Sequence, residues 1–227
     1  MSFASLGAGS IDAVLFDLDG TLVDSAPDLA GAGNEMRVAR GLPVLPLSHF
    51  RPMAGSGARG MVERALGVLA QDLVYAECRD EFLARYEARI TRETQVFEGL
   101  LPVLSAFARD AMPWGIVTNK ASRYSIPLMR SLAALDAAAT LVCGDTTPHA
   151  KPHPAPLLEA ARRLCVDPSR CIYVGDDLRD VQAGTAAGMS TVAVRWGYLG
   201  SGAAIEAWGA SFVVQSPGDL LKLLAMA

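Results

Sequence analysis

The chain has 227 residues, of which 51% are hydrophobic, and a formal net charge of −4. This apolar content excludes a disordered chain, and the length suits one globular unit or a core domain with a smaller insertion. The mild acidity without a basic stripe excludes nucleic acid as an expected partner, and no apolar stretch is long enough to span a bilayer.

The cysteines and the first residues indicate where the protein works. The four cysteines, Cys78, Cys143, Cys165 and Cys171, form no C-x-x-C pair, which argues against a zinc knuckle or a thioredoxin-like site. Reduced, packed thiols are typical of cytosolic proteins. Residues 1–10 carry no positive charge and no long apolar run, so no signal peptide is indicated. We therefore predict a cytoplasmic location.

Short apolar runs alternate with helical patterns along the chain. The predicted strands are Ala13–Phe16, 115–118, 140–143, 171–174, 191–194 and Phe212–Val214. Helical patterns between them cover 122–132, Ala155–Leu164 and 180–187. The runs are nearly continuous rather than alternating, which indicates strands covered on both faces. We predict an α/β core with a doubly wound parallel sheet.

One connection is too long for a crossover between neighbouring strands. About ninety residues separate the first two strands, and helical patterns occur within them at 26–40, 59–69 and 71–90. A structureless loop of this length is implausible in a compact domain. We predict an inserted α-helical cap domain at residues 25–93, and an α/β core formed by residues 1–24 and 94–227.

Polar clusters directly follow four of the predicted strands. They contain Asp17 and Asp19, then Asn119, then Gly144 and Asp145, and finally Asp176. Thr118 ends the second predicted strand, and Lys151 lies in the loop that follows the third. Ligands of open α/β sheets bind outside the carboxyl ends of the strands, so these clusters are expected to converge on one site. Asp17 and Asp19 leave a strand on the same side, and two adjacent carboxylates repel each other without a cation. Their presence favours Mg²⁺, which binds few protein carboxylates.

Each cluster also has a plain structural interpretation. The aspartates around Gly20 can form a simple turn. Asp180 can be a first-turn acid that complements a helix dipole. An isolated Lys151 can be a solvated surface charge. Asp176, at a strand end that faces Asp17, is better explained as a metal ligand.

Taken together, the clusters resemble the four motifs of the haloacid dehalogenase superfamily. The motif residues are Asp17-Leu18-Asp19-Gly20-Thr21, Thr118, Lys151-Pro152 and Gly175-Asp176 with Asp180, in the family's order. The long insertion resembles that family's helical cap of the first type. The resemblance implies a Rossmann-like core and a magnesium-dependent phosphatase that works through an aspartyl-phosphate.

The resemblance also implies roles for individual residues. Asp17 would be the nucleophile, and Asp19 the general acid and then the base. The metal ligands would be Asp17, the Asp19 carbonyl, Asp176 and, in support, Asp180. The phosphate-binding residues would be Leu18, Asp19, Thr21, Thr118, Asn119 and Lys151, with Thr118 and Lys151 also catalytic. Dehalogenases of this superfamily lack the second aspartate, so Asp19 favours phosphate chemistry.

The insertion is expected to close over the site and select the substrate. Its linkers would lie near 23–25 and 94–99, and its segment 53–60 would face the substrate. Gly57 would allow close approach of the backbone to a ligand. Arg59 would grip a substrate carboxylate or hydroxyl groups, or would be a surface residue in the first turn of a helix.

The expected partner is a small phosphorylated metabolite, not a nucleic acid or a membrane, and the chain is expected to be a monomer or a homodimer. Segments 97–99, 117–120 and 173–177 resemble phosphoglycolate phosphatases, which makes phosphoglycolate the expected substrate. Segments 56–62 and 194–198 also resemble phosphatases of N-acetylmuramic acid 6-phosphate, which remains the alternative. A phosphomutase and a non-catalytic phospho-ligand binding protein are the rival classes.

Overall fold

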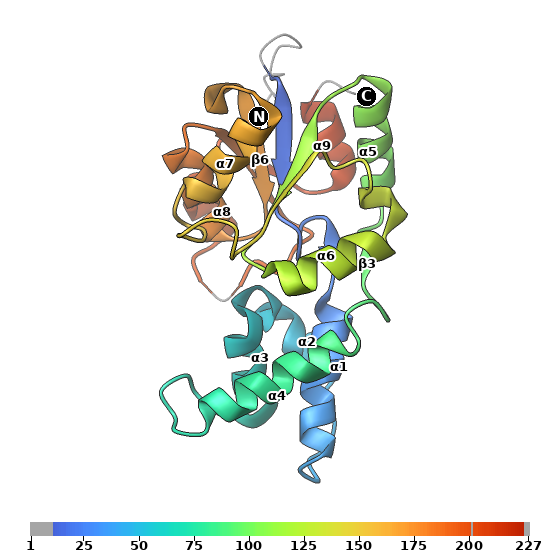
Figure 1. Ribbon diagram of the computed structural model, residues 1–227, viewed down its shortest axis with the longest axis vertical. Coiled ribbons are helices and arrows are strands. Elements are labelled where there is room, and N and C mark those ends of the chain that lie inside the picture. The colour runs from blue at the N-terminus through green and yellow to red at the C-terminus, as the bar shows by residue number, and fades with distance from the viewer. Residues whose placement is uncertain (1–10, 201, 225–227) are drawn as a thin grey trace.

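The computed structural model describes residues 11–200 and 202–224, so the expectation that residues 1–10 carry no signal peptide lies outside the described residues. A six-stranded parallel sheet forms the core, in the order β5-β4-β1-β6-β7-β8 (Figure 1). The strands are β1 (Ala13–Phe16), β4 (Trp114–Val117), β5 (Thr140–Val142), β6 (Cys171–Gly175), β7 (Ser190–Val194) and β8 (Phe212–Val214). The prediction of a doubly wound parallel sheet is confirmed.

The register of the central strand β1 with its two neighbours determines where the site lies. Phe16 lies level with Ile116 of β4 and with Val174 of β6. The chain builds β4 and β5 on one side of β1, and β6, β7 and β8 on the other side. The carboxyl ends of β1, β4 and β6 therefore meet at the point where the strand order reverses, which is where open α/β sheets bind ligands.

Helices cover both faces of the sheet. One face packs on α5 (Leu100–Arg109), α6 (Ser122–Ser131) and α9 (Pro217–Leu223), and the other on α7 (Ala155–Leu164) and α8 (Leu178–Ala186) (Figure 1). Phe16 points into the first layer and Leu15 into the second, as the alternation of side chains along a strand requires. Residues on both faces of β1 are buried, which explains its continuous apolar run.

Some elements differ from the sequence expectations. Helices α5 and α9 were not predicted, and the strand expected to include Thr118 ends at Val117. The helical pattern expected from residue 71 becomes a helix only at Tyr75. Apolar residues can extend a pattern beyond the segment whose backbone forms helical hydrogen bonds, so element ends are the least reliable part of such a prediction.

The long insertion forms the cap helices, α1 (Ala26–Val38), α2 (Leu47–Phe50), α3 (Gly57–Leu66) and α4 (Tyr75–Glu87), with a 3₁₀ turn at Arg51–Ser56. They enclose their own apolar cluster, in which Met36, Phe50, Met61 and Phe82 are buried. This cluster is separate from the cores on the two faces of the sheet. The division into a cap at 25–93 and a core at 1–24 and 94–227 stays a prediction that this packing supports.

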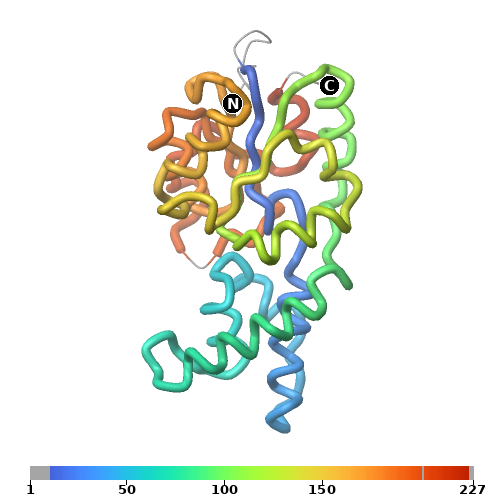
Figure 2. The backbone as a smooth tube through the Cα atoms, viewed as in Figure 1, coloured from blue at the N-terminus to red at the C-terminus, as the bar shows by residue number. Residues whose placement is uncertain are grey.

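The chain passes between the core and the cap helices twice, at neighbouring places (Figure 2). The two crossings, β2 (Val23–Asp24) and β3 (Gln95–Val96), pair as antiparallel strands. The hydroxyl of Tyr198 accepts hydrogen bonds from the backbone amides of Ser25 and Ala26, at 2.8 Å and 3.0 Å. The first crossing is therefore held by a side chain of the core. No helix among the described residues has both the length and the apolar character needed to cross a membrane.

Replacing Phe107 by alanine tests the core beneath the site. Phe107 is buried in α5 against Phe16 and Trp114, with ring centroids 5.9 Å and 6.4 Å away. We expect Phe107→Ala to lower the free energy of unfolding by about 3–5 kcal/mol, because the substitution leaves a cavity. Leu101 of the same helix is 55% exposed, so Leu101→Ala should change the free energy by less than about 0.5 kcal/mol. Chemical denaturation measures both, and equal effects would contradict this packing.

Candidate active site

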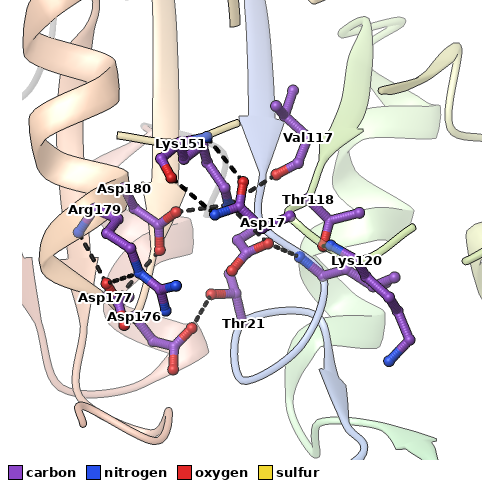
Figure 3. Close-up of polar contacts among 12 residues, drawn as sticks. Asp17, Thr21, Val117, Thr118, Lys120, Lys151, Asp176, Asp177, Arg179 and Asp180 are labelled. Atoms are coloured by element: carbon purple, nitrogen blue, oxygen red, sulfur yellow. Dashed lines mark hydrogen bonds and ion pairs between the residues drawn. The ribbon is translucent and has the colours of Figure 1, made fainter. Parts of the chain in front are cut away.

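Most of the predicted site residues meet at the carboxyl ends of the strands (Figure 3). A cavity of about 330 Å³ lies there. Its lining includes the predicted residues Asp17, Asp19, Thr118, Asn119, Lys151, Asp176 and Asp180. Segments that are distant in the sequence therefore converge on one place.

Lys151 is the cation at the centre of this site. Its side chain is 2% exposed, and its Nζ lies 2.9 Å from Asp17 Oδ1 and 2.7 Å from Asp180 Oδ1. The ammonium group also donates to the hydroxyl of Tyr173 at 2.7 Å and to the carbonyl of Val117 at 3.1 Å. Burial alone would lower the pKa of Lys151, but the charges of the two aspartates outweigh it and raise the pKa. Lys151 is therefore charged and is paired with both aspartates.

Two neighbours place this lysine. The Asn119 side chain donates to the carbonyl of Lys151 and accepts from its amide, both at 2.9 Å. The Tyr173 hydroxyl donates to the carbonyl of Val117 at 2.8 Å. Asn119 thus joins the loops after β4 and β5. The contribution of Tyr173 was missed, although a tyrosine inside the apolar run of β6 was a visible signal.

Asp176 is buried and has fixed partners on both of its oxygens. Thr21 Oγ1 donates to Oδ1 at 2.9 Å, and the amide of Tyr198 donates to Oδ2 at 2.7 Å. A Cβ atom at Gly197 would lie 2.1 Å from Asp176 Cβ, so only glycine fits at this close approach. Thr21 was expected near phosphate, but it does not line the cavity and instead holds Asp176.

Asp180 has two structural roles at once. Its Oδ2 accepts from the amide of Asp177 at 3.1 Å and forms a capping box at the start of α8. Its Oδ1 pairs with Lys151. The helix-start interpretation of Asp180 and its place beside Lys151 therefore both hold.

Asp17, Asp176 and Asp180 can together hold a metal ion. Each offers a carboxylate oxygen within 4.8 Å of the other two. Burial, followed by the charge of Asp180, raises the pKa of Asp17 to about 7 although Lys151 opposes this shift. Burial and the charges of Asp17 and Asp180 raise the pKa of Asp176 well above its usual range. Three carboxyls with one lysine lack positive charge, which fits a divalent cation bound by oxygen ligands.

Asp19 lies beside this cluster on the cap side of the loop. Its Oδ1 accepts from Ser25 Oγ and, at 2.8 Å, from Lys120 Nζ. Lys120 also donates to the hydroxyl of Tyr86 in α4, at 2.6 Å. Lys120 belongs to segment 117–120, but no role was predicted for it.

The two residues expected to contact substrate from the cap lie in different places. Gly57 lines the cavity, whereas Arg59 is exposed and lines a neighbouring hollow with Trp208. Arg179 of the core is a basic residue that contacts the cap loop, since it donates to the carbonyl of Gly55 at 2.6 Å. Leu18 is buried away from the cavity. The substrate role of Arg59 stays a prediction.

Comparison with known proteins defines the class that this fold and site represent. A family model described as haloacid dehalogenase-like hydrolase matches residues 14–194. The chain therefore belongs to the haloacid dehalogenase-like hydrolase family.

The relatives include two kinds of phosphatase. The chain is 39% identical over 217 residues to the N-acetylmuramic acid 6-phosphate phosphatase of Pseudomonas aeruginosa. The alignment covers 96% of each chain. It is 43% identical over 210 residues to the phosphoglycolate phosphatase of Xanthomonas campestris pv. campestris, covering 92% of this chain and 94% of the relative. A crystal structure of a predicted phosphoglycolate phosphatase from Haemophilus somnus 129PT has a TM-score of 0.82 at 24% identity, over 96% of this chain and 99% of that chain.

The raised pKa values predict how the metal-free protein responds to pH. Unfolded aspartates ionise near their ordinary pKa of 3.8, whereas folded Asp17 keeps its proton up to about pH 7. The stability that this group contributes is complete below the unfolded pKa and is lost as the pH rises through the folded one. In EDTA, we expect the thermal unfolding midpoint of the wild type to fall between about pH 5 and about pH 8, and Mg²⁺ to restore it at the higher pH.

Asp176→Asn isolates the carboxyl cluster from other titrating groups. This variant should unfold at a higher temperature than the wild type in EDTA at about pH 8, and its midpoint should respond less to Mg²⁺. Asp136→Asn is the matched control, because Asp136 is exposed on the surface of the α/β domain. This variant should behave as the wild type does. Identical pH profiles for the wild type and Asp176→Asn would contradict the coupling of these carboxyls.

Proposed function

We propose that this protein is a phosphoric monoester hydrolase that uses Asp17 as its nucleophile. The position of Asp17 carries the proposal, because its carboxylate faces the cavity and Oδ1 lies 2.9 Å from the Lys151 ammonium. The phosphatase names of relatives that align over nearly the full chain support it. A carboxylate held beside a fixed cation suits attack on an anionic phosphate, since the two negative charges would otherwise repel.

In the first step, a carboxylate oxygen of Asp17 forms a bond to phosphorus as the bond to the leaving oxygen breaks. Asp19 supplies the proton that this oxygen needs to depart as an alcohol. Lys151 and the hydroxyl of Thr118 bind the phosphoryl oxygens, and Asn119 keeps Lys151 in place. Phosphoryl transfer depends mainly on such positioning and charge neutralisation.

In the second step, water attacks the phosphorus of the aspartyl-phosphate. Asp19 takes a proton from this water, and the bond between phosphorus and Asp17 breaks to release inorganic phosphate. Asp19 then holds the proton for the next cycle. A residue that acts as acid and then as base needs to reach both the leaving oxygen and the water, and the place of Asp19 at the cavity wall suits this requirement.

We propose Mg²⁺ as the metal, bound by Asp17, Asp176 and the carbonyl of Asp19, with Asp180 in support. Mg²⁺ prefers a few carboxylate ligands and keeps water and phosphate oxygens as its others. When bound, it would neutralise charge on the phosphate and orient it. Thr21 and Tyr198 fix both oxygens of Asp176, which prepares this ligand.

We propose 2-phosphoglycolate as the first substrate to consider, because the polar segments that follow the strands resemble its phosphatases. The cavity supports a second candidate, N-acetylmuramic acid 6-phosphate. Leu29, Phe82 and Leu83 of the cap helices give the cavity an apolar wall, and its volume of about 330 Å³ is more than a two-carbon acid fills. The cytoplasmic location stays a prediction of the sequence.

Removal of the nucleophile tests the proposed reaction. We expect Asp17→Asn to lower the rate of phosphate release roughly 10³-fold or more, because the amide cannot form the acyl-phosphate. The control Asp136→Asn should keep the wild-type rate. Acid-quenched wild type should carry a phosphoryl group on the peptide that contains Asp17. A labelled peptide elsewhere, or activity in Asp17→Asn, would contradict the assignment.

Metal removal and a substrate panel test the remaining parts. Phosphate release from 2-phosphoglycolate, N-acetylmuramic acid 6-phosphate and sugar phosphates is measured with EDTA and with Mg²⁺. We expect release only with Mg²⁺, and the highest kcat/KM for 2-phosphoglycolate. A higher kcat/KM for the amino-sugar phosphate would assign the second substrate. Isomerised sugar phosphate without free phosphate would indicate a mutase and contradict the hydrolase proposal.

A further inference from the structure

We propose that Lys120 and Tyr86 are positioning residues for Asp19, so that the cap helices complete the acid/base group of the core. This inference rests on the proposed function and assigns a task to two residues outside the four motifs. Lys120, from the loop after β4, contacts both Asp19, from the loop after β1, and Tyr86 of α4.

Lys120 connects the core to the cap helices within the cavity. Its side chain is 9% exposed, and its Nζ lies 2.8 Å from Asp19 Oδ1 and 2.6 Å from the hydroxyl of Tyr86. In Figure 3 its side chain extends away from Lys151. The two lysines of the site therefore serve different aspartates, Lys151 the expected nucleophile and Lys120 the expected acid/base.

The hydrogen bonds of Asp19 hold only one side of its carboxylate. Ser25 Oγ and Lys120 Nζ both donate to Oδ1. Among residues 11–200 and 202–224, no hydrogen bond to Oδ2 is formed. Two donors on one oxygen fix the rotation of the carboxylate and leave the other oxygen available, as proton exchange with a leaving group or a water requires.

Tyr86 is itself held firmly, and from both sides of the cavity. Its buried ring stacks on Phe82 of α4, with centroids 6.3 Å apart and planes at 7°. It also packs against Tyr124 of α6 in the core, at 5.9 Å. The hydroxyl therefore meets Lys120 only while α4 lies against the core. Displacement of the cap helices would remove one of the lysine's two partners.

The orientation of the Asp19 carboxylate matters in both steps of the proposed reaction. In the first step it donates a proton to an alkoxide leaving group, and in the second it takes one from water. An acid/base group misplaced by a rotation of its carboxylate loses much of its effect. The structure thus links acid/base catalysis to the docking of α4, through one lysine and one tyrosine hydroxyl.

A pair of phosphate esters separates this role from a general loss of structure. p-Nitrophenolate leaves without a proton, so formation of the aspartyl-phosphate from p-nitrophenyl phosphate does not need the acid. 2-Phosphoglycolate and N-acetylmuramic acid 6-phosphate are alkyl phosphates and do need it. The value of kcat/KM reports the steps up to formation of the aspartyl-phosphate, so it is compared for p-nitrophenyl phosphate and whichever alkyl phosphate the wild type hydrolyses better.

The first variant is Tyr86→Phe, which keeps the ring and removes the hydroxyl. We expect its kcat/KM for the alkyl phosphate to fall about tenfold, the equivalent of one hydrogen bond, and its kcat/KM for p-nitrophenyl phosphate to change less than about twofold. Tyr75→Phe removes a hydroxyl from the same helix outside the cavity. This control should match the wild type for both esters.

The second variant removes the amine. Lys120→Met should lower kcat/KM for the alkyl phosphate by roughly 10²-fold, the lower end of what a general acid contributes, with a smaller effect on p-nitrophenyl phosphate. Lys120→Arg keeps a donor and should recover part of the loss. Thermal unfolding of each variant with Mg²⁺ shows whether the fold is kept.

The outcomes are distinct. Equal losses for both esters in Tyr86→Phe and Lys120→Met would show a role in folding or phosphate binding and would overturn the inference. Unchanged alkyl phosphate hydrolysis in Tyr86→Phe would overturn it as well. If the wild type released phosphate from no ester, the proposed function itself would be wrong, and the inference would fall with it.

Discussion

The structure depends on the burial of the Lys151 ammonium between Asp17 and Asp180. An unpaired charge at this depth would be very costly, so the loops after β1, β5 and β6 have to bring their polar groups to one point. Tyr173 and the carbonyl of Val117 complete the contacts of this lysine. The same requirement that keeps the lysine buried therefore places the proposed nucleophile, a cation and the proposed metal ligands together.

The cap helices meet this centre through the loops that carry the predicted site residues. Their apolar residues pack mainly on one another, whereas Lys120 contacts Tyr86 and Arg179 contacts the carbonyl of Gly55. Lys120 lies shortly after Thr118 in the chain, and Arg179 lies directly before Asp180. Apolar packing keeps the cap helices together, and both polar contacts and the packing of Tyr86 against Tyr124 join them to the core. Such a division lets the cap move as a unit while the core keeps its geometry.

Much of the fold was readable because its strands are short, apolar and closely followed by polar residues. Residues on both faces of β1 are buried, which gives a continuous apolar run rather than an alternation. Helix α9 escaped notice because it has only seven residues near the end of the chain, although Ser216 caps it by accepting from the amide of Asp219. The pair β2 and β3 has two residues per strand, which is too short for any periodic pattern.

The sequence by itself determined the α/β class, the long helical insertion and the convergence of Asp17, Lys151 and Asp176. Local patterns and the rule that parallel strands end at one edge are sufficient for these conclusions. Only the tertiary structure decided the partners of each side chain. It assigned Thr21 to Asp176, Arg59 to the outside of the cavity, and Lys120 to Asp19 and Tyr86. The physical reason is that the packing of distant segments sets these contacts, and no local spacing records it.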